Sequence, residues 1–290
     1  MPPIHPIPAV GLGTFRLKGE AVQQVVRDAI QIGYRHIDTA AIYQNEKDIG
    51  AVLQETYNNP LHTLTRSDFW ITSKLSPYDM KKPRESLLQT LRSLQTNYLD
   101  LYLIHWPAVA RKAASSPEHK RLRLNAWKEL NLAKCAGLIL HVGVSNFTPQ
   151  HIQELINETE YGIQGAFVQM EIHPWYWRDA LEIQTRFGEK GVIMVGYALL
   201  AEGRVLGENC PNVGGSERAP PDRRGSERAP SQLAAAADTP GSSPAGYLLP
   251  LDNTYAMSST DEGEFDYYHK QIMASRDPNY DFFVANNFTS

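Results

Sequence analysis

The first two-thirds of the chain alternates short apolar runs with longer segments whose apolar residues recur at helical spacing. A short run rich in β-branched and aromatic residues predicts a buried strand, and apolar residues three or four positions apart predict an amphipathic helix. The expected strands are residues 10–14, 34–38, 69–74, 99–105, 138–144, 166–172 and 192–200. Apolar strands that alternate with helices predict a parallel sheet covered by helices, an α/β fold.

Longer amphipathic runs connect these strands and predict helices, and the connection after residue 144 opens with a helix start signal. Thr148 is a suitable N-cap and Pro149 suits the first helical position. The expected helices are residues 20–32, 45–54, 83–95, 122–136, one that begins at residue 149, and 179–190. The series gives seven strands, one fewer than a complete (β/α)8 barrel of roughly 250 residues.

The composition changes sharply after residue 207. Pro, Gly, Ser, Ala and Arg dominate the next segment, in which the sequence GSERAP occurs twice, at residues 215–220 and 225–230. Such a segment buries too little apolar surface to offset the entropy of ordering it. We therefore expect a barrel domain over residues 1–207, a disordered low-complexity segment over 208–246 and an irregular tail over 247–290.

The bulk composition narrows the class of protein. The chain has 290 residues, 42% of them hydrophobic, and a net charge of -4, which argues against a protein that binds nucleic acid by neutralising phosphates. The proline-rich start does not fit a signal peptide, and no stretch has the length of a membrane span. Cys135 and Cys210 lack metal-ligand spacing. We expect a cytoplasmic protein with reduced thiols and no bound metal.

Four chemically distinct side chains lie at or just after three successive predicted strands. They are Asp38, Tyr43, Lys74 and His105. Carboxyl ends of parallel strands meet at one rim of a βα-barrel, where catalytic groups collect. Taken singly, each residue also has a structural explanation, as a loop cap, a packing tyrosine, a solvated charge and a strand-end histidine. Together they predict a site that donates a proton to a carbonyl oxygen.

Several motifs, in order along the first two-thirds of the chain, resemble those of the aldo-keto reductase family. They are GLGTF at 11–15, GYRHIDTAAIYQNEKDIG at 33–50, ITSKL at 71–75, LDLYLIHWP at 99–107, GVSNF at 143–147, VQMEIHP at 168–174 and the tyrosine of VGYALL at 197. The resemblance implies a (β/α)8 barrel that acts as a monomer on a small carbonyl substrate. It also implies a nicotinamide cofactor, NADPH before NADH, bound without the Rossmann glycine fingerprint.

The resemblance assigns roles to individual residues. Tyr43 donates the proton, Lys74 lowers the phenol pKa from its reference value of about 10, Asp38 holds Lys74, and neutral His105 orients the substrate. The residues implied for the cofactor are Thr14, Asp38, Ser145, Asn146, Gln169 and Tyr197. The residues implied for the substrate are Phe15, His105 and Trp106.

The sequence departs from the family pattern near its carboxyl end. No basic IPKS-type loop for the adenosine phosphate is present, and residues 198–202 read ALLAE where the family has serine, proline and glycine. Loss of the eighth strand would leave the first and seventh strands unpaired. A barrel that binds cofactor poorly and acts as a scaffold is therefore the alternative to an active reductase. Whether this end is a genuine variant or an artefact of the gene model stays open, as does the physiological substrate.

Overall fold

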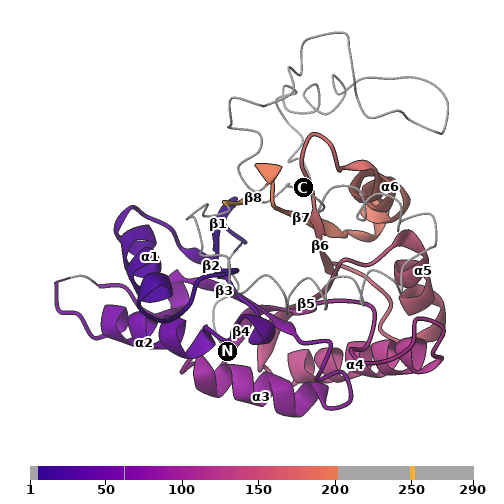
Figure 1. Cartoon of the computed structure of the whole chain (residues 1–290), viewed down its shortest axis with the longest axis horizontal. Helices are drawn as coiled ribbons and strands as arrows, with labels where there is room; N and C mark the ends of the chain where they lie inside the picture. Colours follow the sequence, from indigo (N-terminus) through magenta and orange to yellow (C-terminus); the bar gives the residue numbers. More distant parts are fainter. Residues whose placement is uncertain (1–5, 62, 202–248, 252–290) are drawn as a thin grey trace, which may run out of the picture.

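The computed structural model describes residues 6–61, 63–201 and 249–251, whose strands form one parallel sheet curled into a nearly closed barrel (Figure 1). The strand order is β7-β6-β5-β4-β3-β2-β1-β8, so β1 to β7 follow one another in space as in sequence. The strands are β1 Val10–Gly13, β2 His36–Asp38, β3 Trp70–Leu75, β4 Leu99–Ile104, β5 Ile139–Ser145, β6 Phe167–Glu171, β7 Ile193–Tyr197 and β8 Leu249–Leu251. The predicted fold class is confirmed.

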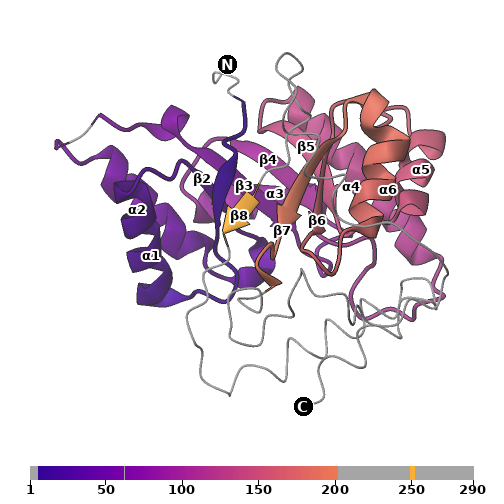
Figure 2. The same ribbon diagram turned by 90° about the horizontal axis from the view of Figure 1, so that it is seen from above.

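Helices lie on the outside of the barrel (Figure 1, and from above in Figure 2). The α-helices are α1 Gly19–Gln31, α2 Glu46–Tyr57, α3 Pro83–Ser93, α4 Glu118–Cys135, α5 Pro149–Glu158 and α6 Arg178–Phe187, and the short 3-10 helices are η1 Ala41–Tyr43, η2 Arg66–Asp68 and η3 Gly188–Lys190. Each α-helix turns an apolar face inward, which buries both it and the outer face of the sheet.

The interior of the barrel is filled by side chains. Every residue of β3 and β4 is buried, as expected for strands covered on both faces. Inside, Trp70 stacks on the imidazole of His141 with ring centroids 5.1 Å apart, and Phe167 lies edge-on to His141 at 5.3 Å. His36 lies on the other side of Trp70, at 6.3 Å. The barrel floor is therefore a packed aromatic layer.

The predicted elements agree with the observed ones except at some ends. The side-chain hydroxyl of Thr148 accepts a hydrogen bond from the amide of His151, which confirms the predicted N-cap. The largest difference is α4, which begins at Glu118, four residues before the predicted start. Its first turn is polar and charged, so the apolar spacing that marks a helix begins only one turn later.

An eighth strand exists where the sequence pattern reveals none. β8 pairs in parallel with β1, with Val10 opposite Leu249 and Leu12 opposite Leu251. The strand β1 is therefore not an open edge. Three residues, one of them proline, are too few for a strand period, which explains why the pattern missed it. The predicted disordered segment over 208–246 and the remainder of the tail lie outside the described residues.

None of the helices in the described part of the chain combines the length and the apolarity that crossing a membrane requires. The same part of the chain holds no group of three or more His, Cys, Asp and Glu side chains placed to hold a metal ion.

Candidate active site

The carboxyl ends of the strands bring the four predicted residues to one rim of the barrel. Asp38 is the last residue of β2, and Tyr43 ends the 3-10 helix η1 that follows it. Lys74 is the penultimate residue of β3, and His105 comes directly after β4. Neighbouring strands are parallel, with Asp38 opposite Thr72 and Lys74 opposite Leu103, so their carboxyl ends meet at the same rim. The structure thus brings together residues that are up to 67 positions apart.

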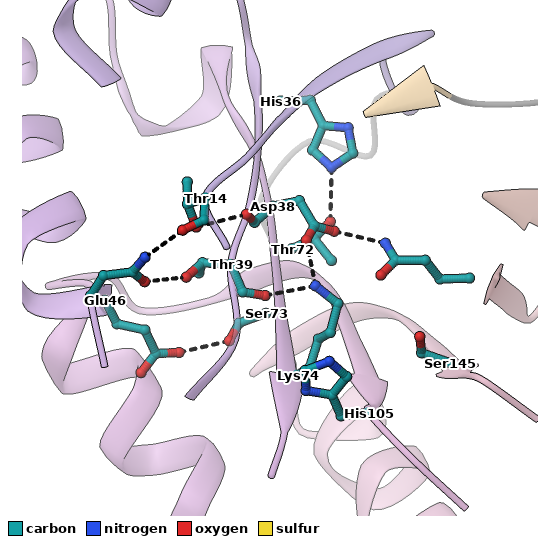
Figure 3. A network of polar contacts seen from close by, with 12 residues as sticks. Thr14, His36, Asp38, Thr39, Glu46, Thr72, Ser73, Lys74, His105 and Ser145 are labelled. Carbon is teal, nitrogen blue, oxygen red and sulfur yellow. Dashed lines mark hydrogen bonds and ion pairs between the residues drawn. The ribbon is translucent and has the colours of Figure 1, made fainter. Parts of the chain in front are cut away.

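A buried ion pair forms the centre of this group. The ammonium of Lys74 contacts carboxylate oxygen Oδ1 of Asp38 and also donates to the main-chain oxygen of Thr39 at 2.9 Å (Figure 3). The Lys74 side chain is 1% exposed and that of Asp38 is 8% exposed. A lysine buried to this degree keeps its charge only with such partners. The pair therefore fixes a positive charge inside the rim.

Hydrogen bonds from two further residues hold Asp38 in place. Its second oxygen, Oδ2, accepts a hydrogen bond from the amide of Gln169 on β6 at 2.8 Å. Its main-chain oxygen accepts from the hydroxyl of Thr14 at 2.9 Å and from the amide of Thr14 at 3.0 Å. Asp38 therefore connects three strands, and both carboxylate oxygens have partners.

The phenol ring of Tyr43 lies between the charged pair and two aromatic rings. The Lys74 ammonium is 5.3 Å from the ring centroid. The imidazole of His105 lies edge-on to the ring, with centroids 5.7 Å apart, and Phe15 lies tilted against it at 5.1 Å. Tyr43 and Phe15 are half-buried, as is Trp106, which stacks on His105 at 6.3 Å. These three rings are therefore partly accessible at the rim.

His105 is held in its neutral form. It is 7% exposed, and burial, with a smaller effect from the Lys74 ammonium, lowers the pKa of its imidazole well below the ordinary value. Its ring nitrogen Nδ1 is buried and has no hydrogen-bond partner in the structure. A neutral imidazole can donate one hydrogen bond to a ligand without adding charge to the site.

The other predicted cofactor residues lie on or directly after β5, β6 and β7. Ser145 ends β5, Gln169 lies within β6, and Tyr197 ends β7. Asn146 has a left-handed backbone (φ 61°), and its amide donates to the main-chain oxygen of His105 and to the hydroxyl of Ser145, both at 3.1 Å. The hydroxyl of Tyr197 donates to the Asn146 side-chain oxygen at 2.7 Å.

This set fits one half of a nicotinamide cofactor. A carboxamide both donates and accepts hydrogen bonds, and Ser145, Asn146 and Gln169 offer hydroxyl and amide groups of both kinds at the rim. The half-buried ring of Tyr197 offers an aromatic face. The fit concerns the nicotinamide end of the cofactor.

Two buried residues of the site were missed by sequence reasoning. Asn45 is fully buried and bonds to the loop after β1, and Glu46 accepts a hydrogen bond from the hydroxyl of Ser73 at 2.6 Å. Burial raises the pKa of the Glu46 carboxyl. Both stand at the predicted start of a helix, where polar residues are ordinary, so only their place two and three residues after Tyr43 could have singled them out.

A βα-barrel with a buried lysine–aspartate pair, a tyrosine and a neutral histidine at its carboxyl-terminal rim has the arrangement of a barrel enzyme. The sequence matches the Aldo/keto reductase family over residues 9–246. The chain therefore belongs to the aldo/keto reductase family, which confirms the resemblance seen in its motifs.

Individual relatives agree with this assignment. The methylglyoxal reductase DkgA of Escherichia coli (strain K12) is 39% identical over 186 residues, which are 62% of this chain and 62% of that protein. The aldo-keto reductase family 1 member A1 of Sus scrofa is 35% identical over 187 residues, 60% of this chain and 56% of its own length. The chain thus spans less than two thirds of these relatives.

Solved structures give the same result for the fold. The aldose reductase from Schistosoma japonicum superposes with a TM-score of 0.59 at 32% identity and covers 68% of this chain and 67% of its own. The aldose reductase from Giardia lamblia gives a TM-score of 0.55 at 33% identity, covering 65% and 64%.

Proposed function

We propose that the protein reduces an aldehyde or ketone to an alcohol with NAD(P)H, and that Tyr43 gives the proton. The observation that carries the proposal is the position of the Lys74 ammonium, which is buried, paired with Asp38 and 5.3 Å from the Tyr43 ring. A positive charge beside a phenol stabilises the phenolate that proton donation leaves behind. This makes the tyrosine a usable general acid at neutral pH.

His105 orients the carbonyl in this proposal. Its imidazole is neutral and lies edge-on to the Tyr43 ring, so it can donate a hydrogen bond to the same oxygen that Tyr43 protonates. As hydride reaches the carbonyl carbon, the oxygen becomes negative, and two donors in a buried setting stabilise that charge. A protonated histidine would compete with Tyr43 as the acid, and burial prevents this.

The nicotinamide cofactor supplies the hydride when it is bound. Ser145, Asn146 and Gln169 would hold its carboxamide, Tyr197 would offer its ring to the nicotinamide, and Thr14 and Asp38 would border the same position. We propose NADPH as the natural form because the family generally uses it, with NADH as the second choice. The contacts of Gln169 with Asp38 and of Tyr197 with Asn146 keep these side chains ordered before binding.

The substrate is a small carbonyl compound that reaches the rim past Phe15 and Trp106. Methylglyoxal is the first compound to test, because the Escherichia coli relative named above is a methylglyoxal reductase. Phe15 lies beside Tyr43 and Trp106 lies beside His105, and both rings are half-buried. Such rings favour a substrate with a small apolar group next to its carbonyl.

The test measures binding and turnover separately. Quenching of NADPH fluorescence reports cofactor binding, and loss of NADPH absorbance with methylglyoxal reports reduction. We expect saturable quenching and turnover that requires both compounds. No quenching at high micromolar NADPH or NADH would overturn the reductase proposal, and quenching without turnover over a panel of aldehydes would favour the scaffold alternative.

A further inference from the structure

Asn45 is a fully buried side chain at the rim, and none of the roles above uses it. It occupies the N-cap position of α2, where an asparagine oxygen ordinarily accepts a hydrogen bond from the first turn of the helix. No such bond is made here. Its side chain bonds instead with the loop after β1 and with Thr39.

The amide of Asn45 uses both of its hydrogens and its oxygen in these contacts. Nitrogen Nδ2 donates to the main-chain oxygens of Thr14 at 2.8 Å and of Leu17 at 2.9 Å. Oxygen Oδ1 accepts from the hydroxyl of Thr39 at 2.7 Å. The position therefore requires a group with two donors and one acceptor, which among side chains of this size only asparagine provides.

The two carbonyls that Asn45 binds lie on either side of a strained turn. The amide of Leu17 bonds to the oxygen of Thr14 at 3.2 Å, which closes a four-residue turn. Within it, Arg16 has a φ of 64°, a conformation that costs a non-glycine residue about 1 kcal/mol or more. Because the left-handed backbone of Arg16 is unfavourable, the turn needs additional contacts at its two ends to keep this conformation.

The turn and Thr39 both border the catalytic group. Phe15, the residue before Arg16, lies 5.1 Å from the Tyr43 ring, and the main-chain oxygen of Thr39 accepts a hydrogen bond from Lys74. Figure 3 shows Thr14, Thr39 and Lys74 together on this side of the rim. Through Asn45, the loop after β1 is therefore connected to the residue that holds the lysine.

We propose that Asn45 is a positioning residue, which fixes the 14–17 turn so that Phe15 rests against Tyr43 and forms one wall of the substrate position. The inference rests on the proposed reductase function for its kinetic consequence. Its structural part, that the Asn45 amide holds the turn, stands without it.

Asn45→Asp is the sharpest variant, because it keeps the shape and the acceptor and removes both donors. We expect kcat/KM for the carbonyl substrate to fall about tenfold, mainly through KM, since Phe15 contacts substrate and transfers no proton. Amide hydrogen exchange of a peptide covering residues 14–17 should accelerate, while a peptide covering β3 stays protected. Asn131→Asp is the matched control, since that amide also donates to a main-chain oxygen, on α4 and away from the rim.

A second variant decides the matter if Asn45→Asp does not fold. Thr39→Val removes the hydroxyl that donates to the Asn45 oxygen. It should also raise KM and accelerate hydrogen exchange at residues 14–17, both to a smaller extent. Unchanged KM together with unchanged exchange at 14–17 in the folded variant would overturn the inference, and so would equal acceleration of all peptides. If the wild type shows no turnover, the reductase proposal fails, and the exchange experiment still decides the role of Asn45.

Discussion

The imidazole of His105 lies edge-on to the phenol ring of Tyr43, with ring centroids 5.7 Å apart and an interplanar angle of 76°. The two side chains come from different βα units, one from the end of β4 and the other from η1 after β2. This contact places the Tyr43 hydroxyl and the His105 imidazole where both could reach one substrate oxygen. The Lys74 ammonium lies 5.3 Å from the centre of the tyrosine ring. The predictions below test what each of these groups does.

Tyr43→Phe removes the proposed proton donor and keeps the ring that contacts Phe15. We expect kcat to fall by roughly 10²-fold to 10⁴-fold, the usual contribution of a general acid, with NADPH affinity unchanged. Steady-state kinetics and fluorescence titration measure the two effects. Tyr57→Phe is the control, because the Tyr57 hydroxyl is buried without a hydrogen-bond partner and its ring lies against Phe69, directly before β3 and away from the rim. Retained turnover in Tyr43→Phe would refute the assigned role.

Lys74→Met leaves the buried carboxylate of Asp38 without its cation. Breaking a buried pair in this way costs about 3–5 kcal/mol of the free energy of unfolding. Adding Asp38→Asn removes the stranded charge, so the double variant should be more stable than Lys74→Met alone, although neither turns over substrate. Urea unfolding measures all three proteins.

The control for this pair is an exposed one. Lys120 and Glu158 form an ion pair at 2.6 Å with side chains 49% and 41% exposed. Because solvent screens such pairs, Lys120→Met should change the urea midpoint little. If Lys74→Met costs no more than this surface variant, the Lys74–Asp38 pair is not the buried charge that the mechanism requires.

His105 should not titrate in the ordinary histidine range. Because burial depresses the pKa of its imidazole, the ratio of wild-type to His105→Gln kcat/KM should stay constant from about pH 6 to 8. Parallel pH–rate profiles of the two proteins measure this ratio. A ratio that changes through pH 6.5 would mean that His105 takes up a proton there and would contradict the neutral role.

His36, in the barrel floor, should make the fold sensitive to acid. Burial lowers the pKa of its imidazole to about 4, while the unfolded chain has the ordinary value near 6.5. Between pH 4 and 6.5 the unfolded state therefore binds more protons than the folded state. The contribution of His36 to the free energy of unfolding is complete above pH 6.5 and falls by about 3 kcal/mol in total as the pH drops to 4.

His36→Gln tests this share of the acid sensitivity. Glutamine can still reach the hydroxyl of Thr72, which lies 3.0 Å from the His36 ring nitrogen, but carries no titrating group. The free energy of unfolding of the His36→Gln variant should depend less steeply on pH between 4 and 6.5 than that of the wild type. Urea unfolding at several pH values measures both. Some slope remains, because His105 and His141 also have lowered pKa values. Identical slopes would contradict the prediction.

Local patterns predicted most of this barrel because each βα unit carries its own signal. Amphipathic runs, together with the N-cap signal at Thr148, located the six α-helices of the described residues, and the four-residue error at α4 arose where its first turn is fully polar. The site was predictable as a set of strand ends, since parallel strands deliver their last residues to one rim.

Contacts between side chains at that rim could not be predicted in the same way. Gln169 was expected to face the cofactor, and its bond to Asp38 joins residues 131 positions apart, which no local pattern encodes. Asn45 was expected at a helix start, and it is there, but its side chain turns to a different loop. The partner that a buried amide side chain takes depends on which acceptor groups tertiary packing leaves without a hydrogen-bond donor.

The pairing of β1 with β8 has a consequence for how the barrel comes together. Val10 and Leu249 are partners although they lie about 240 positions apart, whereas the other strand pairs join neighbours in sequence. As the chain leaves the ribosome, β1 to β7 can assemble while β1 still lacks its last neighbour. Until residues 249–251 have been synthesised, the edge of β1 has no partner strand from its own chain and is open to pairing with another chain.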